Sequence, residues 1–258
     1  MNYGFYTAAS GALTNMARMD VMSNNLANVD TVGFKPLGIA VRQRANVKEE
    51  DQLGYIDSAE LLDTLGAGVM PTATRVSTTQ GALQETGNPL DVALLGEGYL
   101  MVMMDDAEQP IGLTRDGRML VDAQSQRLVH AATGEEVLSV DGEPIAVVPG
   151  VDIEIRDDGS VVQQGTAVGQ LGVVDVPEAK AMRSFGHGLF HPTLGQIEQR
   201  AVSGARVRSH TVEQSAVNAV RTMMGVTNAG RAASSNLGMV GILNESMQLA
   251  ISRLGRVS

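Results

Sequence analysis

The sequence predicts a mixed α and β fold, in which N- and C-terminal helices form a coiled-coil-like pair and the residues between them form a central antiparallel all-β domain. At both ends of the chain, apolar and small residues recur in alternating steps of four and three, which is the rhythm of a coiled-coil seam. In the middle, the rhythm changes to alternation interrupted by glycine turns. We divide the chain into an N-terminal helix with an asparagine-rich exit motif, a connecting segment, a β-rich outer domain and a C-terminal helix that pairs with the first, over residues 1–35, 36–80, 81–202 and 203–258.

The N-terminal helix carries a seam without a charged residue, which runs from Phe5 to Leu26. Arg18 and Asp20 fall just beside this seam. The chain therefore begins with a helix that can bury one face against a partner helix. The larger side chains on this face are Phe5, Met16, Met19 and Leu26.

The asparagine-rich stretch after this helix is an elaborate helix exit. Its amide side chains can bond to nearby backbone, Gly33 permits a turn, and Pro36 prevents the helix from continuing. Binding of a cation or a sugar by Asn24, Asn25 and Asn28 is a less favoured interpretation, because no carboxylate cluster accompanies them.

The connecting segment has charged residues, a candidate short helix at Ala59–Leu65 and a loop through Gly66, Gly68 and Pro71. We assign it no chemistry. From Gly81 onward, short β-rich runs alternate with Asp-Gly, Thr-Gly and Pro-Gly turns, as in an antiparallel β domain. The run Val151–Arg156 alternates most clearly between apolar and polar residues.

The C-terminal stretch Thr211–Ser258 carries the longer seam. Counted from Val212 in steps of four and three, every position is apolar or small except Asn244. A helix that carries this seam from Val212 to Leu254 would be about 65 Å long, too long for the middle of a compact domain. We expect this seam to mediate assembly, and its larger members are Met223, Leu237, Val240, Met247, Ile251 and Leu254.

The two predicted helices differ in length, so about 30 Å of the C-terminal seam has no partner in the same chain. An unmatched apolar stripe predicts self-assembly or a partner helix. Gly225, Gly230, Gly238 and Gly241 each weaken the C-terminal helix by about 1 kcal/mol relative to alanine, so we expect both ends to fray in an isolated chain. The alternative is a two-helix cap on a globular domain, with the glycines as breaks.

Composition excludes several classes of function. A net charge of −10 argues against nucleic acid and anionic membrane surfaces as partners. The absence of cysteine excludes disulfides and thiolate metal sites. No apolar run is long enough to span a bilayer, and the N-terminus lacks the order of a secretory signal. We therefore expect no membrane insertion and, if the protein leaves the cytoplasm, another route of export.

Candidate chemical sites are weak. His187 and His191 have the spacing of two zinc ligands on a helix, but Gly188 and Pro192 indicate a loop or strand edge, so we interpret them as turn histidines. The acidic pairs Asp105-Asp106 and Asp157-Asp158 lie at predicted turns, and no aromatic cleft accompanies them. We identify no catalytic group and expect no cofactor or metal.

Three blocks carry a family resemblance. The first is Ala8-Ala-Ser-Gly11 followed by Ser23–Lys35, the second is Gly81–Val102 with Thr114-Arg-Asp-Gly117, and the third is Val212-Glu-Gln-Ser-Ala-Val-Asn-Ala-Val220. Together they resemble the signatures of the bacterial flagellar rod and hook protein family, although Ala216 replaces the usual asparagine. The first block contributes the motif residues Asn24, Asn25, Leu26, Ala27, Asn28, Thr31, Gly33, Phe34 and Lys35.

This resemblance implies a structural subunit of the flagellar basal-body rod, which polymerises through its terminal helices into a helical tube that transmits torque. Its implied partners are other copies of itself, neighbouring rod proteins and the flagellar type III export apparatus. Its implied location is the rod in the periplasmic space, without a cleaved signal peptide. The modest length and the opening residues are most similar to the proximal rod protein that adjoins the distal rod. Alternatives are a distal rod or hook subunit, a secreted β-domain binding module with a helical stalk, or an enzyme on a β scaffold.

Overall fold

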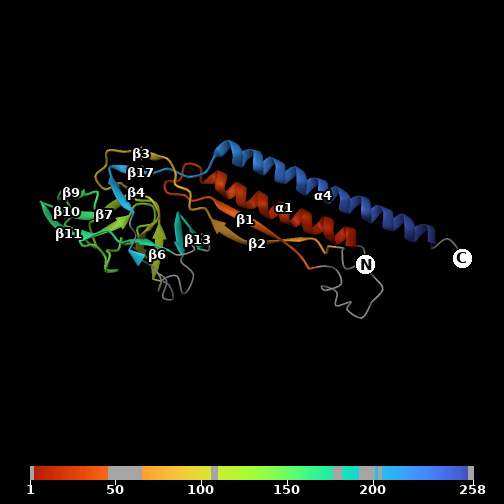
Figure 1. The fold of residues 1–258 in the computed structure, drawn as a ribbon, viewed down its shortest axis with the longest axis horizontal. Helices are drawn as coiled ribbons and strands as arrows, with labels where there is room; N and C mark the ends of the chain where they lie inside the picture. Colours follow the sequence, from red (N-terminus) through yellow and green to blue (C-terminus); the bar gives the residue numbers. More distant parts are fainter. Residues whose placement is uncertain are drawn as a thin grey trace. The chain divides into compact units, whose positions relative to one another are not determined.

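The computed structural model describes residues 3–45, 66–105, 110–176, 182–191, 201–202 and 205–254 (Figure 1). The chain divides into two compact units. We call the first the helical unit, and it comprises Met1–Leu26, Gly38–Thr74 and Ala219–Ser258. We call the second the β unit, and it comprises Ala27–Leu37 and Arg75–Asn218. The predicted fold class is confirmed, since helices lie at both ends of the sequence and antiparallel strands lie between them.

Two helices dominate the helical unit. Helix α1 spans Tyr3–Ala27 and helix α4 spans Ala219–Leu254, and Figure 1 shows them side by side. They are antiparallel, because Gly11 near the start of α1 lies against Asn236, whereas Met22 near its end lies against Gly225 at the start of α4. The two ends of the chain therefore pair with each other.

A two-stranded sheet accompanies the helices. Strand β1 spans Leu37–Gln43 and strand β2 spans Val69–Val76. The backbone N–H of Val69 donates to Ser10 Oγ over 3.3 Å, and Ser10 Oγ also occupies the space that a side chain at Gly68 would need. The hydroxyl of the buried Thr14 donates to the carbonyl of Ser10 over 2.8 Å. The hydroxyl groups of Ser10 and Thr14 on α1 thus form hydrogen bonds with the helix backbone and with the start of β2.

The connecting segment contains more regular structure than predicted. The expected loop through Gly66, Gly68 and Pro71 is wrong from Val69 onward, because β2 continues through Pro71. Proline is tolerated there since a two-stranded sheet leaves each strand with an unpaired edge. The predicted short helix at Ala59–Leu65 lies outside the described residues.

The β unit is built from short antiparallel strands. A six-stranded sheet has the order β13-β14-β6-β5-β12-β15, a three-stranded sheet has the order β11-β10-β9, and three pairs join β16 to β4, β17 to β3 and β7 to β8. The predicted run Val151–Arg156 contains β9, and isolated bridges form at 137–139 and at Ala146. The strands are β3 Leu83–Glu85, β4 Val92–Leu95, β5 Tyr99–Met103, β6 Ile111–Thr114, β7 Met119–Asp122, β8 Arg127–His130, β9 Ile153–Ile155, β10 Ser160–Gln163, β11 Thr166–Gln170, β12 Val173–Asp175, β13 Arg183–Gly186, β14 Leu189–His191, β15 Ala201–Val202, β16 Arg206–Ser209 and β17 Thr211–Glu213.

Strand β5 separates two apolar cores in the β unit. Successive side chains of a strand point to opposite faces of the sheet. Leu100 and Val102 accordingly join one buried cluster, and Tyr99 and Met101 join the other. The near-continuous apolar sequence of β5 follows from burial on both faces.

The predicted start of the C-terminal helix at Thr211 is wrong. Thr211–Glu213 form β17, which pairs with β3, and α4 begins only at Ala219. Thr211 and Val212 are β-branched and nearly fully buried, and both properties favour a strand in this position. Val212 and Ala216 satisfied the four-three count although they precede the helix. The β unit therefore extends past the predicted boundary at residue 202.

Candidate functional site

Small residues form the contact between α1 and α4. Ala229 and Ala233 are the buried apolar residues of α4, with 7% and 6% of their surface exposed. A side chain at Gly225 would come within 2.6 Å of Met22 Sδ, and one at Gly230 within 3.6 Å of Met19 Sδ. Gly225, which weakens the helix locally, therefore allows Met22 of α1 to approach closely, whereas a side chain at Gly230 would make an ordinary van der Waals contact.

The predicted α4 seam only partly coincides with this contact. Val240 is half-buried, whereas Met223, Leu237, Met247 and Ile251 are 58%, 50%, 39% and 71% exposed. The least exposed row, which includes Thr222, Ala229 and Asn236, lies one position before the predicted row of Met223, Gly230 and Leu237. The side chain of Leu254 lies outside the described residues.

On α1, Phe5, Met19 and Leu26 are partly buried, while Met16 is 41% exposed. Tyr6 and Leu13, which the seam did not include, are 54% and 65% exposed. Both helices therefore retain apolar surface that the isolated chain does not bury.

The asparagine-rich motif forms the exit of α1, and the amide of Asn28 accepts a hydrogen bond within the motif. Thr31 Oγ1 donates to Asn28 Oδ1 over 3.1 Å, and Asn25 is buried. Asn24 and Ala27 are exposed. Gly33 adopts a φ of +68°, and any side chain there would overlap the backbone of Arg115 and Asp116. The last two motif residues, Phe34 and Lys35, are buried in the β unit.

Lys35 is part of a buried ionic cluster that the sequence did not reveal. Lys35 Nζ lies 2.6 Å from Glu213 Oε1, and Arg115 Nη1 lies 3.2 Å from Glu213 Oε2. The side chains of Lys35, Arg115 and Glu213 are 1%, 3% and 1% exposed, respectively. We call these three residues the Glu213 cluster.

Backbone groups complete the Glu213 cluster. Lys35 Nζ donates to the carbonyl of Thr79 over 2.7 Å, and the N–H of Gly81 donates to Glu213 Oε1 over 2.7 Å. Arg115 Nη2 donates to the carbonyl of Gly96 over 2.6 Å. These bonds partly offset the desolvation of the buried charges, a cost that can exceed their mutual attraction.

Burial controls the electrostatics of this region. Burial lowers the pKa of Lys35 below its ordinary value, and the hydrogen bond to Glu213 only partly opposes that effect. The Arg115 guanidinium lies 5.2 Å from the centre of the Tyr99 ring, a cation–π arrangement. Burial raises the pKa of Tyr99 to about 12.

The Glu213 cluster joins all three motif blocks within the β unit. Lys35 comes from the first block, Arg115 from the second and Glu213 from the third. Backbone bonds reinforce the junction, because the N–H of Gly33 donates to the carbonyl of Glu213 over 2.7 Å and that of Ala216 to Phe34 over 3.1 Å. The segment that follows α1 in sequence is thereby fastened to the segment that precedes α4. The sequence offered no signal that singled out these three residues, because the blocks also contain other charged residues such as Asp30, Asp91 and Glu97.

A second buried ionic group lies around Asp116. Its Oδ2 lies 2.6 Å from Arg118 Nη2 and 3.4 Å from His130 Nε2, and its own side chain is 2% exposed. Burial alone would raise the pKa of Asp116, but the nearby His130 ring and the hydrogen bonds from Arg118 outweigh burial and lower it. His130 Nδ1 lies 2.8 Å from Thr133 Oγ1, which fixes the ring at a turn.

The residues singled out as candidate chemical sites lie at turns and at the end of a strand. His187 lies in the turn between β13 and β14, and His191 ends β14. Asp157 and Asp158 accept hydrogen bonds from Ser209 and Ser160, while Asp106 lies outside the described residues. Within the described ranges, no group of three or more His, Asp or Glu residues could hold a metal ion, and no helix is long and apolar enough to cross a bilayer.

Comparisons with known proteins point to one group of relatives. A family model described as flagella basal body rod protein matches residues 5–35. The flagellar basal-body rod protein FlgF of Salmonella typhimurium is 32% identical over 90% of both chains. FlgF of Caulobacter vibrioides is 27% identical over the full length of both chains, and FlgG of the same organism is 27% identical over 94% of this chain and 95% of its own.

Proposed function

The chain belongs to the family of flagellar basal-body rod proteins, and from this premise we propose that it polymerises through its two terminal helices into the tube of the rod. Proteins of this family are structural components of the flagellar basal body. The proposed role is mechanical, since the subunit transmits torque through helix contacts and has no reaction to perform.

The apolar surface of α4 is the observation that carries this proposal. Helix α4 has 36 residues and α1 has 25, so α4 is about 16 Å longer. Large apolar side chains on a long, narrow element indicate a surface that other helices cover. The exposed ones on α4 are Val220, Met223, Met224, Leu237, Met239, Ile242, Met247, Leu249 and Ile251.

Repeated contacts of this kind would build a filament. A contact between two different surfaces that does not close on itself generates a helical array. The partners are then other copies of this chain and neighbouring rod proteins, and close packing of the helices resists bending and twist. In this proposal, the helical ends at 1–35 and 203–258 pack in the tube, 36–80 connects, and 81–202 forms the outer β domain. The outer β domain continues to Glu213, where strand β17 ends.

Export and position within the rod are further parts of the proposal. We place the subunit in the periplasmic part of the rod, after passage through the flagellar type III export apparatus as an unfolded chain. The absence of cysteine suits a chain that crosses an oxidising compartment unfolded. Its modest length and its opening residues favour the proximal rod protein that adjoins the distal rod.

Two charge substitutions test the helix surface. Leu237→Asp and Ile251→Asp place a carboxylate on exposed apolar positions of α4, so the isolated chain should keep its β unit folded. Burying an unpaired carboxylate in a subunit contact is strongly unfavourable. We expect both variants to be absent from purified basal bodies, and the cells to lose motility.

Gln248→Asp is the matched control, because it adds the same charge at an exposed polar position of α4. It should incorporate into basal bodies. Motile cells whose basal bodies contain Leu237→Asp at the level of the unchanged subunit would contradict the proposal.

A further inference from the structure

The methionines of this chain differ in exposure between the two units. The sequence has 14 methionines and no cysteine. In the β unit, Met101, Met104, Met119 and Met182 are buried, with between 1% and 6% of their surface exposed. In the helical unit, each methionine that the structure describes is half-buried or exposed. The methionine side chains that solvent can reach therefore lie mainly on the two helices and on β2.

Three methionines of α4 are more than half exposed. Met223, Met224 and Met239 have 58%, 61% and 52% of their surface exposed. We call these three residues the Met224 group. The other exposed methionines are less accessible, with 41%, 38% and 39% for Met16, Met70 and Met247.

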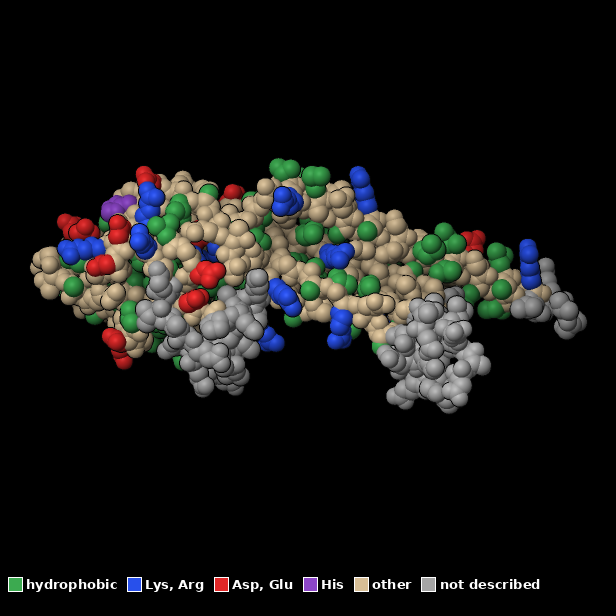
Figure 2. Space-filling view, in the orientation of Figure 1, with side chains coloured by type: hydrophobic (Ala, Val, Ile, Leu, Met, Phe, Trp, Pro, Cys, Tyr) green, Lys and Arg blue, Asp and Glu red, His purple; other side chains and the backbone are tan. Residues whose placement is uncertain are grey.

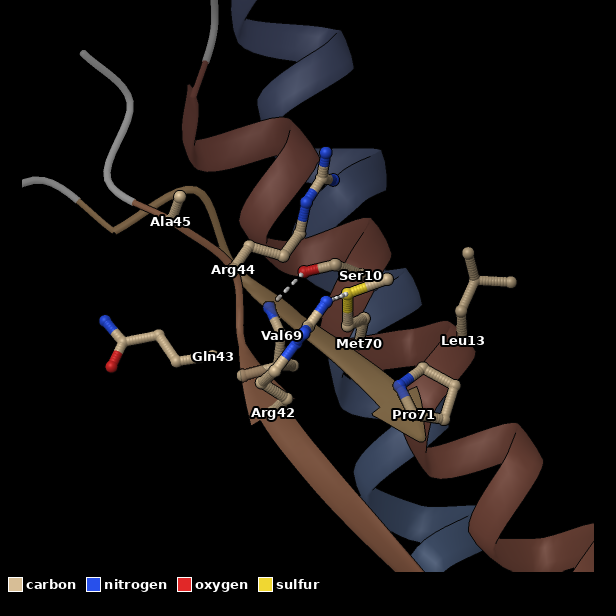
Figure 3. A pocket seen from close by; sticks show the side chains of 9 residues that line it. All are labelled: Ser10, Leu13, Arg42, Gln43, Arg44, Ala45, Val69, Met70 and Pro71. Atoms are coloured by element: carbon tan, nitrogen blue, oxygen red, sulfur yellow. Dashed lines mark hydrogen bonds between the residues drawn. The ribbon is translucent and has the colours of Figure 1, made fainter. Parts of the chain in front are cut away.

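Met70 is a contrasting case in the helical unit. Figure 3 shows its side chain beside Arg42, whose Nη2 donates a hydrogen bond to Met70 Sδ over 3.4 Å. A thioether is a weak acceptor, but this bond engages a sulfur lone pair. Among the residues that the structure describes, no hydrogen bond reaches the sulfur atoms of the Met224 group. Their lone pairs are therefore more open to a reagent in solvent than that of Met70.

Met224 lies in a row of exposed apolar side chains along α4. With 3.6 residues per turn, positions that are 4, 18 or 25 residues apart fall on nearly the same face of a helix. Val220, Ile242 and Leu249 share this face with Met224, and all four are more than half exposed. The buried Ala229 lies about 140° away around the helix. Figure 2 shows hydrophobic side chains, in green, at the surface over the helices.

We infer that the Met224 group makes assembly of this chain sensitive to hydroperoxides. Hydrogen peroxide or an organic hydroperoxide converts these methionines of the unassembled subunit into sulfoxides, and the oxidised subunit no longer packs against its neighbours. This inference rests on the proposed function, since it describes the regulation of the same helix surface.

The oxidation is a two-electron step. A sulfur lone pair forms a bond to one peroxide oxygen while the O–O bond breaks. That oxygen passes its proton to the departing hydroxide or alkoxide, which leaves as water or an alcohol. The sulfur is oxidised by two electrons and the peroxide is reduced by two. No thiolate of the same chain competes for the peroxide, because the chain has no cysteine.

A sulfoxide is incompatible with a dry helix contact. It replaces a flexible apolar side chain by a polar one, whose oxygen is a hydrogen-bond acceptor. Burial of this oxygen without a donor is unfavourable, and we expect each sulfoxide to weaken a subunit contact about tenfold.

Oxidation of the purified full-length chain tests the selectivity. The chain is treated with hydrogen peroxide, and mass spectrometry of its tryptic peptides gives the oxidation rate of each methionine. The Met224 group should be oxidised at least about tenfold faster than Met101 and Met119, because a buried sulfur reacts only after the fold opens. Equal rates for the two sets overturn the inference.

Cells that produce the subunit during a pulse of hydrogen peroxide test the effect on assembly. Catalase then removes the peroxide before the subunits are allowed to assemble. Subunits that enter basal bodies should carry about tenfold less sulfoxide at the Met224 group than the unassembled subunits of the same cells. Equal sulfoxide fractions in the two pools overturn the inference.

Leucine substitutions supply the second arm, since leucine is apolar, has a similar volume and cannot form a sulfoxide. Each chain's incorporation into basal bodies is divided by its own level without peroxide. This ratio should fall for the natural chain and much less for the combined variant Met223→Leu, Met224→Leu, Met239→Leu. The matched control Met101→Leu removes a buried methionine and should remain as sensitive as the natural chain.

An equal fall for the combined variant and the natural chain overturns the inference. A natural chain that is absent from basal bodies without any peroxide contradicts the proposed function instead, so the two failures are distinguishable.

Discussion

Lys35 Nζ lies 2.6 Å from Glu213 Oε1, although 178 positions separate the two residues in sequence. The pair is buried, and Arg115 shares the same carboxylate. It connects the chain just after α1 with the chain just before α4, inside the β unit. We therefore expect that loss of the Glu213 carboxylate lowers the free energy of unfolding of this unit.

Glu213→Ala should destabilise the β unit by about 3–5 kcal/mol, because Lys35 and Arg115 would remain buried without their counter-charge. Urea unfolding followed by circular dichroism measures the change. Glu85→Ala removes an exposed ion pair with Arg208 and should cost at most about 1 kcal/mol. The triple variant Lys35→Met, Arg115→Leu, Glu213→Leu should recover stability relative to Glu213→Ala. Equal midpoints for Glu213→Ala and Glu85→Ala would show that the cluster contributes nothing.

Gly33→Ala should be more destabilising than Gly150→Ala. Both glycines have positive φ, +68° and +79°, which costs an L-residue about 1–2 kcal/mol. A methyl group at Gly33 would additionally overlap the backbone of Arg115, whereas nothing lies within 4 Å at Gly150. Comparing the urea midpoints of the two variants tests this expectation. Similar losses of stability would mean that the backbone at Gly33 can move away from Arg115 at little cost.

Acid should weaken the β unit partly through Asp116. Its pKa is lowered in the folded state, so the ionised carboxylate stabilises the fold above the unfolded value of about 4, and this contribution disappears as pH falls through the lower folded value. The free energy of unfolding measured from about pH 6 downward should fall less steeply for Asp116→Asn. Val129→Ala, a core truncation that keeps the carboxylate, should shift the curve without changing its slope. An unchanged slope in Asp116→Asn would assign the acid sensitivity to other groups.

Limited proteolysis of the isolated chain should leave a resistant core that begins before Gly33 and ends after Ala216. The backbone bonds at Gly33 and Ala216 and the Glu213 cluster belong to this core. Helix termini without a cover open more readily than a packed core. Mass spectrometry of the fragments gives both boundaries, and a stable fragment that lacks Lys35 or Glu213 would contradict the role given to the cluster.

Gly238→Ala and Gly241→Ala should raise the helicity of the isolated chain, since each glycine costs a helix about 1 kcal/mol and an added methyl group meets nothing within 4 Å. Gly225→Ala faces Met22 Sδ at 2.6 Å and should gain less. Circular dichroism at increasing temperature separates the two cases. If the two exposed glycines serve close contacts in the rod, the same alanines should reduce incorporation into basal bodies.

Local patterns predicted much of the fold. The helix expected to Leu26 ends at Ala27, and the run predicted at Val151–Arg156 contains strand β9. Val212 was misassigned because a strand residue can satisfy a helical count by coincidence. Its pairing with β3, more than a hundred residues earlier, decides its conformation.

The sequence by itself determined where helices, strands and turns form, because these depend on residues a few positions apart. Only the tertiary structure decided that Lys35, Arg115 and Glu213 meet, and that Ala229, which lies off the predicted seam, is buried whereas Leu237 on that seam is exposed. Burial and ion pairing depend on groups brought together from distant parts of the chain. A charged residue looks the same in sequence whether water or another charge will satisfy it.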